Sequence, residues 1–145
     1  MDINKVAVIG GGTMGNGIAH VFALKGIDVF LTEMNEDFYN RALNTISGNL
    51  DRQVKKQIIS NDEKNNILTK IHKVIGIQKI PSDVQLVIEA IYENKDAKLS
   101  IFKHLEKQLN PECIFASNTS SISITELSSV CRSRWSPYHY KKNPV

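Results

Sequence analysis

Three glycines with the spacing G-x-G-x-x-G follow a short apolar run near the start of the chain. Gly10, Gly12 and Gly15 come directly after Val6–Ile9 and open a helical pattern. In such a run the first glycine permits a tight turn from strand to helix. The second lets the backbone approach a pyrophosphate, and the third lets the helix pack closely against the sheet. Because the N–H groups and the positive dipole end of a new helix attract anions, the spacing predicts a dinucleotide-binding loop. The predicted cofactor-binding loop comprises Gly10, Gly11, Gly12, Thr13, Met14 and Gly15.

An acidic residue stands where such a loop needs one. Glu33 ends the apolar run Asp28–Glu33, eighteen positions after Gly15. A carboxylate at this point can accept both hydroxyls of the adenosine ribose and repels a 2′-phosphate. Two like charges ~4 Å apart repel by roughly 4 kcal/mol at an effective dielectric constant of ~20. The sequence therefore predicts NAD rather than NADP as the cofactor. The alternative is that Glu33 is a solvated acid at the end of a strand.

Composition limits the class of protein. A length of 145 residues suits one domain, and 41% hydrophobic with 23% charged residues is ordinary for a soluble globular chain. No apolar run approaches the ~18 residues of a membrane helix, and no leader peptide is expected. Two cysteines without a C-x-x-C spacing favour a reducing compartment, so we expect a cytoplasmic protein without a metal site.

The formal net charge of +3 comes from the end of the chain. Residues 132–145 hold four Arg or Lys and no acid, so the remainder carries a net charge of −1. A nearly neutral body gives no electrostatic reason to expect nucleic acid as a partner. We predict one domain over residues 1–131, followed by a basic tail over residues 132–145. The tail is expected to be irregular because Pro137 does not suit a central strand.

Apolar runs and helical periodicities alternate along the chain. Strands are predicted at about Lys5–Ile9, Val29–Thr32, Val74–Ile77, Val84–Glu89 and Cys113–Ala116. Helices are predicted at Thr13–Lys25, in a helical hairpin over about residues 36–72, and at Lys95–Gln108. This alternation favours an α/β fold, a Rossmann-type, doubly wound, mostly parallel sheet. The hairpin between the second and third strands is longer than a crossover needs, which suggests that it covers a ligand.

Polar or glycine-rich clusters follow three of the predicted strands. They are Gly10–Gly15, Glu89–Asn94 and Ser117–Ser121. Ligands of open α/β sheets bind beyond the carboxyl ends of the strands. We therefore expect the three clusters to converge on one crevice.

Three blocks of this sequence resemble the NAD-binding half of the 3-hydroxyacyl-CoA dehydrogenases, particularly bacterial 3-hydroxybutyryl-CoA dehydrogenases. The blocks are Val8–Gly15, Val87–Asn94 with Lys98, and Ala116–Thr125. Many enzymes share the glycine block, whereas Glu-Ala-x-x-Glu-Asn followed by Ser-Asn-Thr-Ser-Ser is far more specific. The resemblance covers residue 1 to about residue 130, including the hairpin. It implies reversible oxidation of the 3-hydroxyl of a fatty acyl-CoA, with hydride passing to NAD, in fatty acid or butanoate metabolism. It also implies a homo-oligomer for the full-length family.

The resemblance implies roles for particular residues on the nicotinamide side. Ala90, Glu93 and Lys98 would lie beside the cofactor. Asn118 and Ser120 would form the catalytic wall, with Ser120 in contact with both cofactor and substrate. A preorganised donor such as the Ser120 hydroxyl, placed at the substrate oxygen, is commonly worth a few kcal/mol.

The resemblance also places the CoA part of the substrate. Lys56 on the hairpin is the candidate for a phosphate contact, and Lys98 and Ser120 would meet the same ligand. Plain structural roles are the alternatives. A run such as Ser117–Ser121 is typical of a turn and a helix N-cap, and Glu93 with Lys98 could be a surface pair worth less than ~1 kcal/mol. Lys56 could belong to a solvated face.

The end of the chain departs from the family pattern. The family's general base is a histidine in a His-aromatic-x-Asn-Pro-Val motif, followed by a partner glutamate and a helical domain. Here His139-Tyr140 and Asn143–Val145 are similar, with one extra residue between His139 and Asn143. His139 is thus a candidate base, and a tail histidine is the alternative. Because the glutamate and the C-terminal helical domain are absent, we expect a truncated fragment that binds NAD and turns over acetoacetyl-CoA extremely slowly. A non-catalytic NAD-binding or assembly module is the alternative function.

Overall fold

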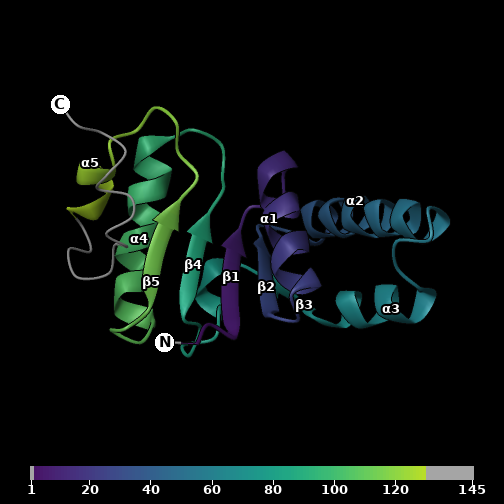
Figure 1. The fold of residues 1–145 in the computed structure, drawn as a ribbon. Coiled ribbons are helices and arrows are strands. Elements are labelled where there is room, and N and C mark those ends of the chain that lie inside the picture. Colours follow the sequence, from purple (N-terminus) through teal and green to yellow (C-terminus); the bar gives the residue numbers. More distant parts are fainter. Residues whose placement is uncertain (1, 130–145) are drawn as a thin grey trace.

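The computed structural model describes residues 2–129, which form one parallel sheet covered by helices (Figure 1). The five strands lie in the order β3-β2-β1-β4-β5, which confirms the predicted Rossmann-type α/β fold. The division at residue 131, the basic tail and His139 lie at or beyond the end of the described residues. The strands are β1 (Lys5–Ile9), β2 (Asp28–Glu33), β3 (Ile71–Ile75), β4 (Leu86–Glu89) and β5 (Ile114–Ser117).

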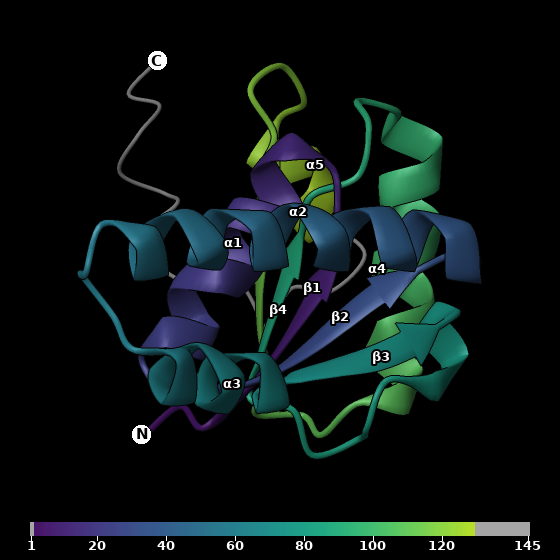
Figure 2. The same cartoon turned by 90° about the vertical axis from the view of Figure 1, so that its right-hand side faces the viewer.

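Helices cover both faces of the sheet. One face is covered by α1, α2 and α3, and the other by α4, α5 and the 3₁₀ turn η1. In Figure 2, α2 and α3 lie in front of the strands and α4 lies behind them. This division follows from right-handed crossovers, because the chain moves one way from β1 to β3 and the other way from β4 to β5. The helices are α1 (Thr13–Leu24), α2 (Glu36–Lys55), α3 (Asn61–Thr69), η1 (Ile77–Lys79), α4 (Lys95–Gln108) and α5 (Ile124–Ser128).

The central strand β1 is buried on both faces. Val6 and Val8 pack on the side of α1, α2 and α3, whereas Ala7 and Ile9 pack on the side of α4. This explains why its sequence is a continuous apolar run and does not alternate between apolar and polar residues. The strand carries the glycine loop at its carboxyl end.

Side chains cap most of the long helices, with one exception. The Asn35 side chain accepts from the N–H of Phe38 at the start of α2, and Asn94 caps α4 in the same way. Ser60 and Glu63 form a capping box at α3. By contrast, α1 begins after Gly12 without a capping side chain from the described residues. Its first N–H groups are thus left for other partners.

The strand β3 begins earlier than predicted. It starts at Ile71, three residues before the predicted Val74, because Ile71 pairs with Val29 of β2 and is buried there. The spacing of Ile67 and Ile71 fits a helix, but α3 ends at Thr69. Two helices do occupy the predicted hairpin. The α2 side chains packed on α1 and the sheet are Tyr39, Ala42, Ile46 and Leu50.

Within residues 2–129, the helices are all too short or too polar to span a bilayer. The same residues contain no group of three potential metal ligands from His, Cys, Asp or Glu.

Candidate cofactor and substrate site

The three predicted clusters lie at the same edge of the sheet. The Gly10 N–H donates to the Thr32 carbonyl at 2.9 Å, and the Ala90 N–H donates to the Ile9 carbonyl at 2.8 Å. The Asn118 N–H likewise donates to the Glu89 carbonyl at 2.8 Å. These bonds join the carboxyl ends of β2, β1, β4 and β5, at the upper edge of the sheet in Figure 1. The three clusters thus follow one another along a single edge of the sheet, and their convergence on one crevice stays a prediction.

Each glycine of the loop meets a different requirement. Gly10 has a φ of +93°, and a Cβ atom there would lie 2.8 Å from the Ala90 carbonyl oxygen. A Cβ atom at Gly15 would lie only 1.7 Å from the Gly10 carbonyl oxygen, so α1 packs directly on the end of β1. Around Gly12, apart from its own chain neighbours, no described atom lies within 4 Å of a Cβ position. The loop thus combines a tight turn, close helix packing and open space at the start of α1.

Glu33 faces this loop. One of its carboxylate oxygens accepts from the Gly11 N–H at 2.5 Å, and the other accepts from the Met34 N–H at 3.3 Å. The side chain is one of those that line a cleft beside the glycine loop. A carboxylate held there is available to ribose hydroxyls.

A largely apolar cleft of about 590 Å³ opens beside the glycine loop and Glu33. Large apolar side chains on its walls are unusually exposed: 77% for Met34, 41% for Phe38 and 69% for Tyr92. Exposed apolar surface of this kind, with a few convergent polar groups, is typical of a ligand site. The cleft thus suits a flat apolar group such as adenine next to a ribose.

A buried ion cluster lies behind the ends of β4 and β5. The Lys98 ammonium is 3.0 Å from Oε2 of Glu89 and 2.7 Å from Oε1 of Glu93. Lys98 and Glu89 are fully buried, and the Ser117 hydroxyl donates to Glu89 at 2.5 Å. Fully buried lysines are rare and need compensating charge. Glu89 is a site residue that was not predicted individually, although an acid that closes a buried strand is a signal for one.

The second oxygen of Glu93 binds the turn after β5. It accepts from the Thr119 hydroxyl at 2.9 Å, the Ser120 N–H at 3.1 Å, and the Ser121 N–H and hydroxyl at 3.2 and 2.8 Å. The Lys98 ammonium, followed by the Ser121 hydroxyl, holds the pKa of Glu93 well below its usual range. Glu93 and Lys98 are therefore not a simple surface pair, because one partner is buried and the other organises a turn.

The remaining predicted site residues lie apart from the apolar cleft. Asn118 and Ser120 are exposed after β5 and are not among the described residues that line the cleft. Lys56 is exposed at the far end of α2, which at 20 residues is about 30 Å long. The structure thus brings the glycine loop, Glu33 and Ala90 together and leaves Lys56 at a distance.

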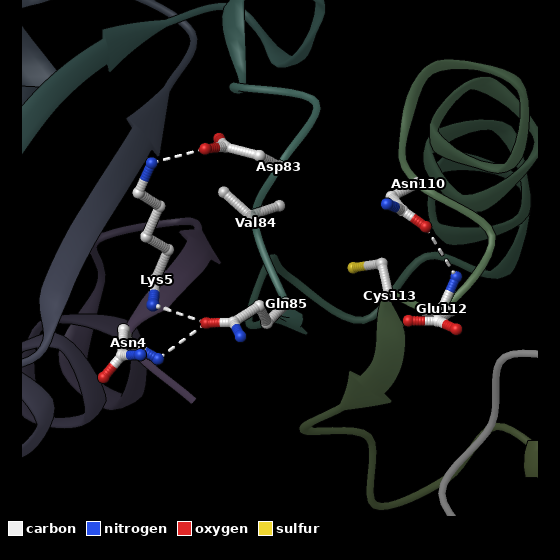
Figure 3. Close-up of a pocket in the computed structure, with 8 residues that line it drawn as sticks. All are labelled: Asn4, Lys5, Asp83, Val84, Gln85, Asn110, Glu112 and Cys113. Atoms are coloured by element: carbon white, nitrogen blue, oxygen red, sulfur yellow. Dashed lines mark hydrogen bonds and ion pairs between the residues drawn. The ribbon is translucent and has the colours of Figure 1, made fainter. Parts of the chain in front are cut away.

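Another hollow, of about 420 Å³, lies at the opposite edge of the sheet (Figure 3). Several of its polar groups are paired with one another. The Lys5 ammonium forms an ion pair with Asp83, and the Gln85 side chain accepts from the N–H groups of Asn4 and Lys5. It lies at the amino ends of the strands, where open α/β sheets do not place their ligands.

This fold and loop define a class of protein. A parallel sheet of this order, with a glycine loop at β1 that faces an acid at β2, is a Rossmann-type dinucleotide-binding domain. The sequence matches the family described as "3-hydroxyacyl-CoA dehydrogenase, NAD binding domain" over residues 5–144. The chain belongs to this family, and the prediction of NAD as the cofactor of the domain is confirmed.

Similar proteins are longer than this chain. A 3-hydroxybutyryl-CoA dehydrogenase of Bradyrhizobium diazoefficiens is 46% identical over 127 residues, which are 86% of this chain and 42% of that protein. The crystal structure of FadB2 from M. tuberculosis superposes with a TM-score of 0.88 at 33% identity, covering 93% of this chain and 48% of that one. The (S)-3-hydroxybutyryl-CoA dehydrogenase PaaH1 from Ralstonia eutropha has a TM-score of 0.87 at 35% identity, with coverage of 92% and 48%. This chain thus spans less than half the length of these relatives.

Proposed function

We propose that this NAD-binding domain serves an enzyme that interconverts the 3-hydroxyl and 3-keto groups of a short-chain acyl-CoA in fatty acid or butanoate metabolism. The observation that supports it most is the open space at Gly12 opposite Glu33, with the Ser120 turn fixed at the same edge of the sheet. Two of the similar proteins are named 3-hydroxybutyryl-CoA dehydrogenases, which supports a short acyl chain.

The described residues fit NAD. The space at Gly12 leaves room for a pyrophosphate at the uncapped start of α1, where the free N–H groups attract its charge. Glu33 would accept the hydroxyls of the adenosine ribose, and adenine would enter the apolar cleft that Phe38 and Met34 line. Bound there, NAD would supply a hydride acceptor for the 3-carbon of the alcohol.

Ser120 and Asn118 supply polar groups for the substrate. Within residues 2–129, the Ser120 hydroxyl has no hydrogen-bond partner, since its contact with Glu93 uses the backbone N–H. It is thus able to donate to the 3-oxygen of the substrate, where a preorganised donor contributes most. Removal of the 3-hydroxyl proton needs a base. His139 is the candidate by resemblance, and it lies outside the described residues.

The positive charge at the end of α2 supports a proposed site for the phosphates of CoA. Lys56 follows Arg52 and Lys55 in the last turn of α2, so three cations gather at one exposed helix end. A CoA ester is long enough to reach beyond the edge of the sheet. A direct contact of Lys98 with CoA stays a prediction, and its enclosure by two carboxylates favours an indirect role.

Titration of the 145-residue chain with NADH, followed by addition of acetoacetyl-CoA, tests the proposal. We expect saturable NADH binding and turnover far below the ~1–10³ per second typical of enzymes. Absence of binding at millimolar NADH would reject the proposed function. Turnover at enzyme-like rates would instead show that the chain needs no further domain. Binding without turnover under any reconstitution would favour a non-catalytic NAD-binding module.

We further propose that the full-length protein is a homo-oligomer in the cytoplasm, and that its partners include neither nucleic acid nor a membrane. The nearly neutral charge of residues 1–131 and the cysteine usage support the proposed partners and location.

A further inference from the structure

The buried end of the ion cluster is rigidly held. Glu89 is fully buried at the end of β4, where its carboxylate accepts from the Ser117 hydroxyl at 2.5 Å and from the Ile91 N–H at 2.6 Å. The first donor is a side chain on the last residue of β5, and the second is a backbone N–H two residues after the end of β4. Its Oε2 also lies 3.0 Å from the Lys98 ammonium. The position of that ammonium is thus set by strand ends that the sheet already fixes.

The other end of the cluster reaches the surface. Only Glu93 is partly exposed, with 33% of its side chain accessible, whereas Lys98 and Glu89 are at 0%. Its Oε1 binds Lys98, and its Oε2 receives four donors from the turn at Thr119–Ser121. Charge-assisted bonds of this kind are stronger than neutral ones. The network therefore runs from the interior of the sheet to the turn that carries Ser120.

We propose that Lys98 and Glu89 are positioning residues: Glu89 fixes the Lys98 ammonium, which fixes Glu93, and Glu93 holds the turn that presents the Ser120 hydroxyl. Lys98 then acts on the Ser120 turn through Glu93. This inference rests on the proposed function, because only that function gives Ser120 a ligand to meet.

Amide hydrogen exchange without any ligand tests the positioning step. A double variant, Glu89→Gln with Lys98→Met, removes both buried charges, so neither is left unpaired. We expect the amides of Ser120 and Ser121 to exchange at least about tenfold faster, with the amide of Val8 in β1 unchanged. Lys95→Met is the matched control, since Lys95 lies on the same helix but pairs with Glu126 at the surface, and it should change nothing.

A pH titration separates positioning from general support of the fold. The charged group that faces Glu93 is Lys98, with Glu89 behind it, while Lys95 is engaged by Glu126. In the unmodified chain the turn amides should report a Glu93 midpoint well below the usual range for glutamate. In the double variant the midpoint should rise toward the ordinary value. A folded double variant with the original exchange rates and midpoint would overturn the inference.

Glu93→Ala covers the case in which the double variant does not fold. It leaves the buried Lys98–Glu89 pair intact and must produce the same faster exchange at Ser120 and Ser121. Unchanged exchange in this variant also overturns the inference.

Comparing the affinities of two ligands tests whether the Ser120 turn contributes to cofactor binding. ADP-ribose contains only the part of NAD expected at Gly12 and Glu33, so its affinity should be equal in the unmodified chain and in either cluster variant. NADH should bind several-fold more weakly to the variant. A loss of NADH binding by the unmodified chain would reject the proposed function and leave the exchange result standing.

Discussion

Replacing Gly15 by alanine tests whether the contact between α1 and β1 sets both stability and cofactor binding. The new Cβ atom would lie 1.7 Å from the Gly10 carbonyl oxygen, whereas real Cβ atoms essentially never approach closer than 3.0 Å. The helix must therefore move by at least about 1.3 Å against a backbone atom that cannot rotate away. Overpacking usually costs about 1–3 kcal/mol, and a backbone clash belongs at or above the upper end.

The expected loss is large for a domain of this size. A cost of about 3 kcal/mol is a substantial part of the roughly 5–15 kcal/mol that keeps a domain folded. At a urea dependence of about 1–3 kcal/mol per molar, it lowers the denaturation midpoint by roughly 1–3 M. Because the shift also moves the start of α1 away from the loop, we expect NADH binding to be lost even where the variant is folded.

Two other glycines of the same segment provide matched controls. At Gly17 and Gly12, apart from chain neighbours and the backbone of α1 itself, no described atom lies within 4 Å of a Cβ position. Gly17→Ala, inside α1, should stabilise the domain by about 0.5–1 kcal/mol, because alanine favours a helix interior. Gly12→Ala should fold normally yet bind NADH at least roughly tenfold more weakly, since its methyl group fills space needed by the pyrophosphate. If Gly15→Ala kept the midpoint and the NADH affinity of the unmodified chain, the argument for close packing would be refuted.

Three further substitutions address single interactions. Glu33→Gln should weaken NADH binding by roughly ten- to a hundredfold and narrow the preference for NAD over NADP, measured by fluorescence titration, because charge-assisted bonds contribute about 1.5–3 kcal/mol. The His72 hydrogen bond lowers the pKa of Asp28, so its stabilising contribution is present above the ordinary aspartate pKa and is lost as the pH falls through the lowered value. Below about pH 4, the free energy of unfolding of Asp28→Asn should therefore fall less steeply with pH than that of the unmodified chain. Identical pH profiles of the two chains in urea denaturation would contradict this. Ser60→Ala, which breaks the capping box of α3, should cost about 1 kcal/mol in urea denaturation, and an unchanged midpoint would show that the cap is not formed in solution.

Local chemistry made part of this structure predictable from the sequence. The glycine loop could be predicted because its requirements are local. The positive φ at Gly10 and the missing side chain at Gly15 both concern residues that are close together in the sequence. Lys95–Gln108 has the predicted bounds of α4, since Asn94 caps its start and apolar spacing marks its length. The start of β3 was missed because Ile71 satisfies a helical spacing and a strand pairing equally well. Only its pairing with Val29 decides between them.

The buried ion cluster could not be predicted from the sequence, because burial depends on the tertiary structure. Glu93 and Lys98 stand five residues apart, which is the pattern of an ordinary surface pair, and nothing local shows that Lys98 is fully enclosed. Its enclosure depends on Glu89 from β4 and Ser117 from β5, which meet only because those strands are neighbours in the sheet. The same tertiary pairing changes the chemistry expected of Lys98. A lysine at the surface attracts phosphate, whereas one between two carboxylates has its charge compensated and serves to hold Glu93 in place.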